Sequence, residues 1–143
     1  MMFNLKNKKA VITGATGGIG YSILEKFYSE GVTVLGSGTN EEKLNKLKSD
    51  FNGMILKKFD ISKHDEIEKF VDNVCDELGG CPEILINNAG IGKSKKIDEI
   101  EIKDFIDVFE VQSSVEYNAL YSEIRHMLKI MIFNKLFHVN IYL

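Results

Sequence analysis

Short apolar runs alternate along this chain with stretches in which apolar residues recur every three or four positions. Five runs have the length of buried strands: residues 9–13, 32–35, 54–59, 83–86 and 137–143. Four stretches have helical spacing: residues 18–30, 41–49, 67–78 and 104–134. Strands separated by helices predict right-handed crossover units, and therefore a parallel sheet with helices on both faces. The pattern thus predicts a single α/β domain.

Several polar residues and glycines mark where the predicted helices begin and end. Gly31 is a suitable C-terminal stop for the first helix, and Asn40 can cap the helix at 41–49. Ser62 and Asp65 have the spacing of a capping box for the third helix, which the Gly79–Gly80 pair closes.

Composition supports an ordinary domain in a reducing compartment. The 143 residues are 44% hydrophobic and 27% charged, and the formal net charge of −3 gives no positive field for nucleic acid. No apolar run reaches the roughly 20 residues of a membrane span, and the lysine-rich start lacks a signal core. We therefore expect a cytoplasmic protein whose two cysteines, Cys75 and Cys81, are buried or idle thiols.

The most informative segment is Thr13-Gly14-Ala15-Thr16-Gly17-Gly18-Ile19-Gly20, between the first predicted strand and the first predicted helix. Gly14 permits a tight exit from the strand, Gly18 permits close approach of a pyrophosphate, and Gly20 permits close helix–sheet packing. The helix N-terminus then offers unpaired N–H groups to phosphate. No Gly-Lys-Ser/Thr follows, which excludes a P-loop. Taken alone, such glycines could equally serve close packing.

Three motifs together resemble the short-chain dehydrogenase/reductase family. They are the Thr-Gly-x-x-x-Gly-x-Gly turn, Asp60-Ile61 after the third strand, and Asn87-Asn88-Ala89-Gly90 after the fourth. The resemblance implies a Rossmann-like doubly wound parallel sheet of about five strands, order 3-2-1-4-5, over residues 1–143. Within the family, residues 34–40 and the asparagine motif are most similar to bacterial 3-oxoacyl-[acyl carrier protein] reductases, which use a nicotinamide dinucleotide.

Carried over by position, the resemblance implies roles for individual residues. Those expected to surround the pyrophosphate and the adenosine ribose are Gly14, Thr16, Gly17, Gly18, Ile19 and Gly20. Asp60 would accept a hydrogen bond from the adenine amino group, and Ile61 would pack against the adenine ring. Asn88, Ala89 and Gly90 would line the path to the nicotinamide ribose.

The end of the second strand bears on the choice of cofactor. An acidic residue there would bind the ribose 2′-hydroxyl of NAD and repel a 2′-phosphate. This chain instead has Ser37, Gly38, Thr39 and Asn40, which favours NADP(H) over NAD(H). Many NADP-selective relatives also carry a basic residue where this chain has Gly17.

The family's catalytic residues have no counterparts here. No Tyr is followed four positions later by Lys, and Gln112 stands where the family has its helix Asn. The family's Ser would fall at or just after Leu143. We expect the front half of a reductase, incomplete relative to the family and inactive by itself. The alternative is a truncated gene product that serves as a non-catalytic dinucleotide-binding or oligomerising fragment.

The sequence also bears on partners, metal sites and one other class of α/β domain. The helix at 104–134 resembles an oligomer-forming helix of the family. A small basic cluster, Lys93, Lys95 and Lys96, could bind an acidic acyl carrier protein. The three histidines and two cysteines lack metal-ligand spacing, so no metal site is expected. A phosphoacceptor receiver domain fits the length, but Thr13 and Gly14 stand where it would need carboxylates.

Overall fold

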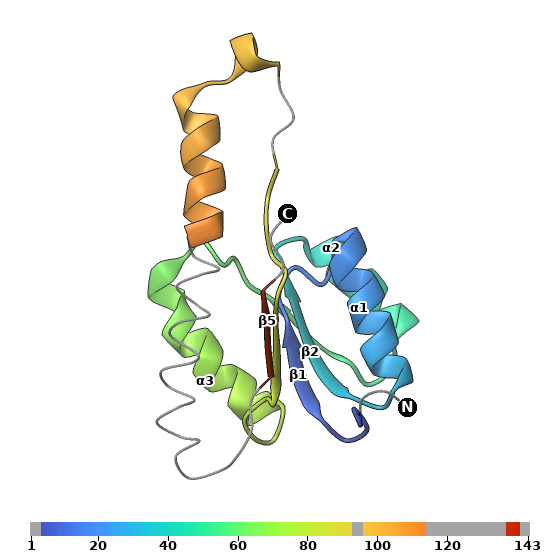
Figure 1. Ribbon diagram of the computed structural model, residues 1–143. Coiled ribbons are helices and arrows are strands. Elements are labelled where there is room, and N and C mark those ends of the chain that lie inside the picture. Colours follow the sequence, from blue (N-terminus) through green and yellow to red (C-terminus); the bar gives the residue numbers. More distant parts are fainter. Residues whose placement is uncertain (1–3, 93–95, 114–136, 141–143) are drawn as a thin grey trace.

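A computed structural model describes residues 4–92, 96–113 and 137–140 of this chain (Figure 1). The strands are β1 (Lys9–Ile12), β2 (Thr33–Gly38), β3 (Ile55–Lys58), β4 (Ile84–Asn87) and β5 (Phe137–Asn140). The helices are α1 (Gly18–Ser29), α2 (Glu41–Asp50) and α3 (Ile67–Glu77), with short 3-10 turns η1 (His64–Glu66) and η2 (Ile97–Glu99). A further helix covers residues 102–113, and the rest of the long helix expected to reach residue 134 lies outside the described residues.

The five strands form one sheet in the order β3-β2-β1-β4-β5, and every neighbouring pair is parallel. Val11 of β1 lies opposite Leu35 of β2 on one side and Leu85 of β4 on the other. The predicted doubly wound sheet and its strand order are therefore confirmed.

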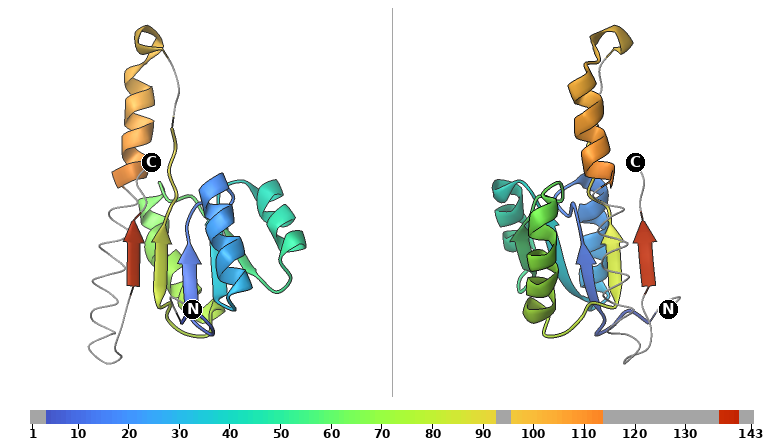
Figure 2. Two further views of the ribbon diagram at one scale, coloured as in Figure 1. Left: turned by 45° about the vertical axis from the view of Figure 1, so that its right-hand side comes forward. Right: turned by 90° about the vertical axis from the view of Figure 1, so that its left-hand side faces the viewer.

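Two apolar clusters cover the two faces of the sheet. On one face, Leu24 of α1 and Leu47 of α2 pack with Ala10, Ile12 and Val34. On the other face, Val74 and Leu78 of the α3 segment pack with Val11 and Leu35. Figure 2 shows α1 and α3 on opposite sides of the strands. Because neighbouring strand residues point to opposite faces, each apolar run supplies both clusters, as expected for a covered parallel sheet.

The helix boundaries follow the predicted signals with one exception. Gly31 (φ 76°) and Gly79 (φ 62°) both take the left-handed conformation that ends a helix. The capping box predicted from Ser62 and Asp65 is wrong. The Ser62 hydroxyl donates instead to Asp60 Oδ1 at 2.7 Å, and the chain makes the η1 turn before α3 begins. The N-cap residues of η1 and α3 are Lys63 and Glu66, and neither makes a side-chain capping bond. Ser62 lies before both cap positions, in a local turn with Asp60.

Replacing Asn40 with alanine tests the one cap that uses a side chain as predicted. Asn40 Oδ1 accepts from the Lys43 backbone N–H at 2.9 Å, at the start of α2. Loss of this acceptor should lower the free energy of unfolding by about 1 kcal/mol, measured by urea denaturation. Asn40→Asp keeps the acceptor and should stay within about 0.5 kcal/mol of the parent. Equal losses in both variants would contradict the capping role.

The helix at 102–113 stands beyond the carboxyl end of the sheet (Figure 2). Asp104 Oδ2 accepts from the Glu101 backbone N–H at 3.1 Å near the start of this helix. Phe105 and Phe109 supply apolar positions of the helical spacing in residues 104–134, yet they are 68% and 63% exposed, because this helix lies beyond the end of the sheet. Within the described residues, no helix has the length and apolar character that crossing a membrane requires.

Candidate nucleotide-binding site

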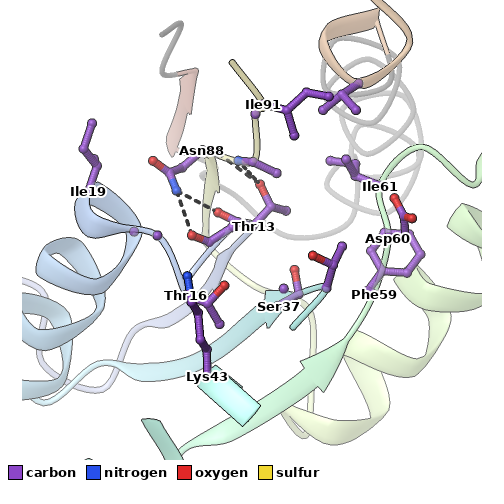
Figure 3. Close-up of a pocket in the computed structure, with 18 of the residues that line it drawn as sticks. Thr13, Thr16, Ile19, Ser37, Lys43, Phe59, Asp60, Ile61, Asn88 and Ile91 are labelled. Atoms are coloured by element: carbon purple, nitrogen blue, oxygen red, sulfur yellow. Dashed lines mark hydrogen bonds between the residues drawn. The ribbon is translucent and has the colours of Figure 1, made fainter. Parts of the chain in front are cut away.

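β1 lies in the middle of the sheet. The chain adds β2 and β3 on one side of β1, and then returns to add β4 and β5 on its other side. In open α/β sheets, ligands bind outside the carboxyl ends of the strands at such a switch point. A pocket of about 400 Å³ lies there (Figure 3). Its lining includes all thirteen predicted cofactor residues: Gly14, Thr16, Gly17, Gly18, Ile19, Gly20, Ser37, Thr39, Asp60, Ile61, Asn88, Ala89 and Gly90.

The turn after β1 depends on glycine at two positions. Gly14 has φ 65°, and the Ala15 N–H beyond it donates to Ser37 O of β2 at 2.8 Å. At Gly20, an added Cβ would lie 2.3 Å from Gly14 O and 2.7 Å from Asn88 Nδ2. Any side chain at Gly20 would therefore push α1 away from the turn and from the sheet.

The N-terminus of α1 faces the pocket with unused backbone donors. The first amide to bond within the helix is Tyr21 N–H, which donates to Gly17 O at 2.8 Å. The amides of Gly18, Ile19 and Gly20 precede it and have no acceptor one turn earlier. Gly17 at the N-cap has no capping side chain, and a Cβ on Gly18 would meet nothing within 4 Å. This open cradle of N–H groups suits an anionic ligand.

Thr13 and Asn88 join the carboxyl ends of β1 and β4. Thr13 Oγ1 accepts from the backbone N–H groups of Asn88 and Ala89, each at 3.0 Å. In turn, Asn88 Nδ2 donates two hydrogen bonds, to Thr13 O and to Gly14 O, both at 3.1 Å (Figure 3). Both residues are buried, at 5% and 6% exposure. Asn88 therefore holds the glycine turn in place, a positioning role beyond lining the pocket.

The third-strand motif lies at the far side of the pocket. Asp60 Oδ1 accepts from both the N–H and the hydroxyl of Ser62, at 3.0 and 2.7 Å. These bonds fix the carboxylate at the pocket wall. Ile61 beside it is buried, and Phe59 before it stacks on Phe70 with ring centroids 3.9 Å apart.

The first turn of α2, which follows β2, contains a charged residue that sequence reasoning missed. Lys43, in the first turn of α2, lines the pocket together with Ser37 and Thr39, and its side chain extends toward Thr16 (Figure 3). It is the only cation in the lining that the described residues provide, and Asp60 is the only carboxylate there. The Asn40 cap was the available signal, because it places Lys43 in the first turn of a helix that starts beside the pocket.

The helix at 102–113 contributes Val111 to the lining. Gln112, at the family's Asn position, is half-buried but is not among the described residues that line the pocket. Ile91, also missed, lines the pocket beside the asparagine motif. In the described part of the chain, His, Cys, Asp and Glu side chains form no cluster that could hold a metal ion.

Comparison with known proteins agrees with this geometry. The family model for short chain dehydrogenases matches residues 8–136. The chain is 31% identical over 115 residues to 2-dehydro-3-deoxy-D-gluconate 5-dehydrogenase of Formosa agariphila, covering 77% of this chain and 43% of that protein. It is 30% identical over 130 residues to 3-oxoacyl-[acyl-carrier-protein] reductase FabG of Vibrio cholerae, covering 88% and 52%.

Among solved structures, the chain resembles 3-ketoacyl-(acyl-carrier-protein) reductase from Brucella melitensis complexed with NADH. The TM-score is 0.84 at 24% identity, covering 95% of this chain and 57% of that one. This likeness concerns the fold. The chain spans about half the length of the curated relatives it matches.

Proposed function

This chain belongs to the short-chain dehydrogenase/reductase family, and from that premise we propose that its pocket binds a nicotinamide dinucleotide, NADP(H) in preference to NAD(H). The observation that carries the proposal is the open cradle of Gly18, Ile19 and Gly20 amides at the N-terminus of α1. Phosphate oxygens are the acceptors that such a site fits best. The residues present therefore suit the pyrophosphate of a dinucleotide.

The remaining lining residues divide the pocket into subsites. Asp60 would accept from the adenine amino group, and Ile61 would pack against the ring. Asn88, Ala89 and Gly90 would direct the other end of the cofactor along β4 toward the nicotinamide. Thr16, Ser37 and Thr39 would surround the adenosine ribose.

The preference for NADP(H) rests on the hydroxyl groups after β2 and on one positive charge in the first turn of α2. Ser37 and Thr39 supply hydroxyl groups, and Lys43 supplies an ammonium that can reach the same corner of the pocket. The acidic residues that begin α2, Glu41 and Glu42, do not line the pocket in the described part of the chain. A 2′-phosphate would therefore meet a cation rather than a carboxylate.

We further propose that the chain serves an oxidoreductase that interconverts a carbonyl and a hydroxyl, with a 3-oxoacyl group on an acyl carrier protein as substrate, in the cytoplasm. When bound, the nicotinamide supplies or accepts the hydride. The similarity to a 3-oxoacyl reductase supports this substrate class. No Tyr-x-x-x-Lys pair occurs among the 143 residues. The second candidate is a dinucleotide-binding chain without turnover of its own, assembled through the helix that begins at residue 102.

Calorimetric titration of the chain with NADPH and NADH tests the cofactor proposal. NADPH should bind more tightly, and Lys43→Met should weaken NADPH binding about 5- to 10-fold because a charge-assisted bond to the 2′-phosphate is lost. NADH affinity should change less than about twofold, since it has no such phosphate. Lys46→Met on the same helix is the control, because Lys46 does not line this pocket.

The outcomes separate the two parts of the proposal. No heat with either cofactor would contradict dinucleotide binding by this chain. Equal affinities, or equal losses in Lys43→Met for both cofactors, would contradict the NADP(H) preference alone.

A further inference from the structure

The two cysteines, expected to be buried or idle thiols, lie side by side. Cys75 Sγ and Cys81 Sγ are 3.5 Å apart, and both side chains are half-buried. Cys75 is in the last turns of α3, and Cys81 follows the turn that leads into β4. A disulfide has a sulfur–sulfur bond of about 2.05 Å, so a small change in side-chain torsion would bring the atoms to bonding distance.

The turn between the cysteines holds them in this position. Gly79 and Gly80 both have positive φ, at 62° and 140°, and reverse the chain directly after α3. Gly80 N–H donates to Cys75 O at 2.8 Å, which ties the turn to the residue that carries the first thiol. Lys9 Nζ of β1 donates to Gly79 O at 2.6 Å and fixes the turn to the sheet.

The elements on either side of the turn are anchored as well. Leu78 is buried against Val11 and Leu35, and Ile84 begins the pairing of β4 with β1. Neither thiol can therefore move far from the other without disturbing the sheet. Folding raises the effective concentration of one thiol at the other, as a preorganised linkage does.

We propose that Cys75 and Cys81 form a reversible dithiol–disulfide site. One thiolate attacks the sulfur of a low-molecular-weight disulfide such as oxidised glutathione and releases one reduced thiol. The second cysteine thiolate then attacks the mixed disulfide and releases the other. The small disulfide gains two electrons and two protons, and the protein loses them as its own S–S bond forms.

The site lies away from the nucleotide pocket. Cys81 precedes the amino end of β4, whereas Asn88 and the pocket follow its carboxyl end. Oxidation would therefore close a short covalent loop between α3 and β4 without touching the pocket lining. By the loop-closure argument, the disulfide should be about 10- to 50-fold more stable in the folded chain than in the unfolded one.

The test equilibrates the whole chain with buffers of reduced and oxidised glutathione, under native conditions and in urea, followed by thiol alkylation and mass spectrometry. Under native conditions the chain should lose two hydrogen atoms and carry no glutathione. Its equilibrium constant for oxidation should exceed that in urea about 10- to 50-fold. The unfolding equilibrium of the oxidised chain should shift by the same factor, because the two measurements close one thermodynamic cycle.

Single substitutions provide the matched controls. Cys75→Ser and Cys81→Ser should each accept one glutathione as a stable mixed disulfide, since the second thiol is absent. Glutathione adducts on the unsubstituted chain, an unchanged mass, or equal equilibrium constants with and without urea would each overturn the proposal. These readouts use no cofactor, so they are independent of the function proposed for the pocket.

Discussion

Gly20→Ala is expected to lower the free energy of unfolding by about 3 kcal/mol or more, because its Cβ has no space. The new atom would lie 2.3 Å from Gly14 O and 2.9 Å from Ala15 Cα, and both are backbone atoms that cannot rotate away. Relief would require α1 to move off the glycine turn. Urea or thermal denaturation followed by circular dichroism measures the loss, and dinucleotide binding should disappear with it.

Gly18→Ala is the matched variant for this test. An added Cβ there meets nothing within 4 Å, so stability should stay within about 1 kcal/mol of the parent. The methyl group would occupy the path of the pyrophosphate, and NADPH affinity should fall about 10-fold or more through lost close approach. Equal stability of the two variants would contradict the packing role of Gly20. Unchanged NADPH affinity in Gly18→Ala would contradict the assignment of the cradle.

Thr13→Val is expected to destabilise the chain by about 2–4 kcal/mol while preserving the shape of the side chain. The Thr13 hydroxyl accepts from two backbone N–H groups, those of Asn88 and Ala89. Valine would leave both donors without this acceptor in a site that is 5% to 6% exposed at Thr13 and Asn88. Each unsatisfied buried donor costs about 1–3 kcal/mol. The free energy of unfolding from urea denaturation is the readout.

Thr13→Ser is the control, because it keeps the hydroxyl and removes only a methyl group. Its loss should be about 1 kcal/mol, the usual cost of one buried methyl group. If valine and serine were equally destabilising, the hydroxyl would not be what joins the ends of β1 and β4. A larger loss in Thr13→Val than in Thr13→Ser would support the Thr13 hydroxyl as the link between β1 and β4 that keeps the glycine turn in shape.

These substitutions test whether the position of the backbone, more than the chemistry of the side chains, determines the shape of the pocket. Gly14 and Gly20 allow the turn and helix α1 to approach each other, and Thr13 and Asn88 then lock the two central strands. The resulting cradle presents amides rather than charged groups. Lys43 and Asp60 add charge only toward the two edges of the pocket.

Much of this arrangement could be predicted from local sequence signals. Apolar runs of strand length marked β1 to β5, and Asn40, Gly31 and Gly79 marked helix ends, because caps and left-handed turns depend on neighbouring residues alone. The crossover rule then left few ways to arrange the parallel strands. The predicted capping box failed because Ser62 takes part in a local turn with Asp60, ahead of the cap positions of η1 and α3.

Other features depended on contacts between distant segments. Phe105 and Phe109 occupy apolar positions of the helical pattern, but a helix face is buried only where another element covers it, and this helix lies beyond the end of the sheet. Lys43 entered the pocket because pairing of β2 with β1 carries the start of α2 to the switch point. The spacing of residues along the sequence does not by itself show that a side chain of α2 lies beside the carboxyl end of β1.

For this protein, the sequence by itself determined the order of the elements, the parallel sheet and the glycine cradle, because these follow from short-range patterning and backbone freedom. Only the tertiary structure decided that Lys43 faces the nucleotide pocket, that Asn88 supports the glycine turn, and that Cys75 and Cys81 meet. Each of these contacts depends on the three-dimensional path of the chain, through sheet pairing or a chain reversal, which residue spacing alone does not specify.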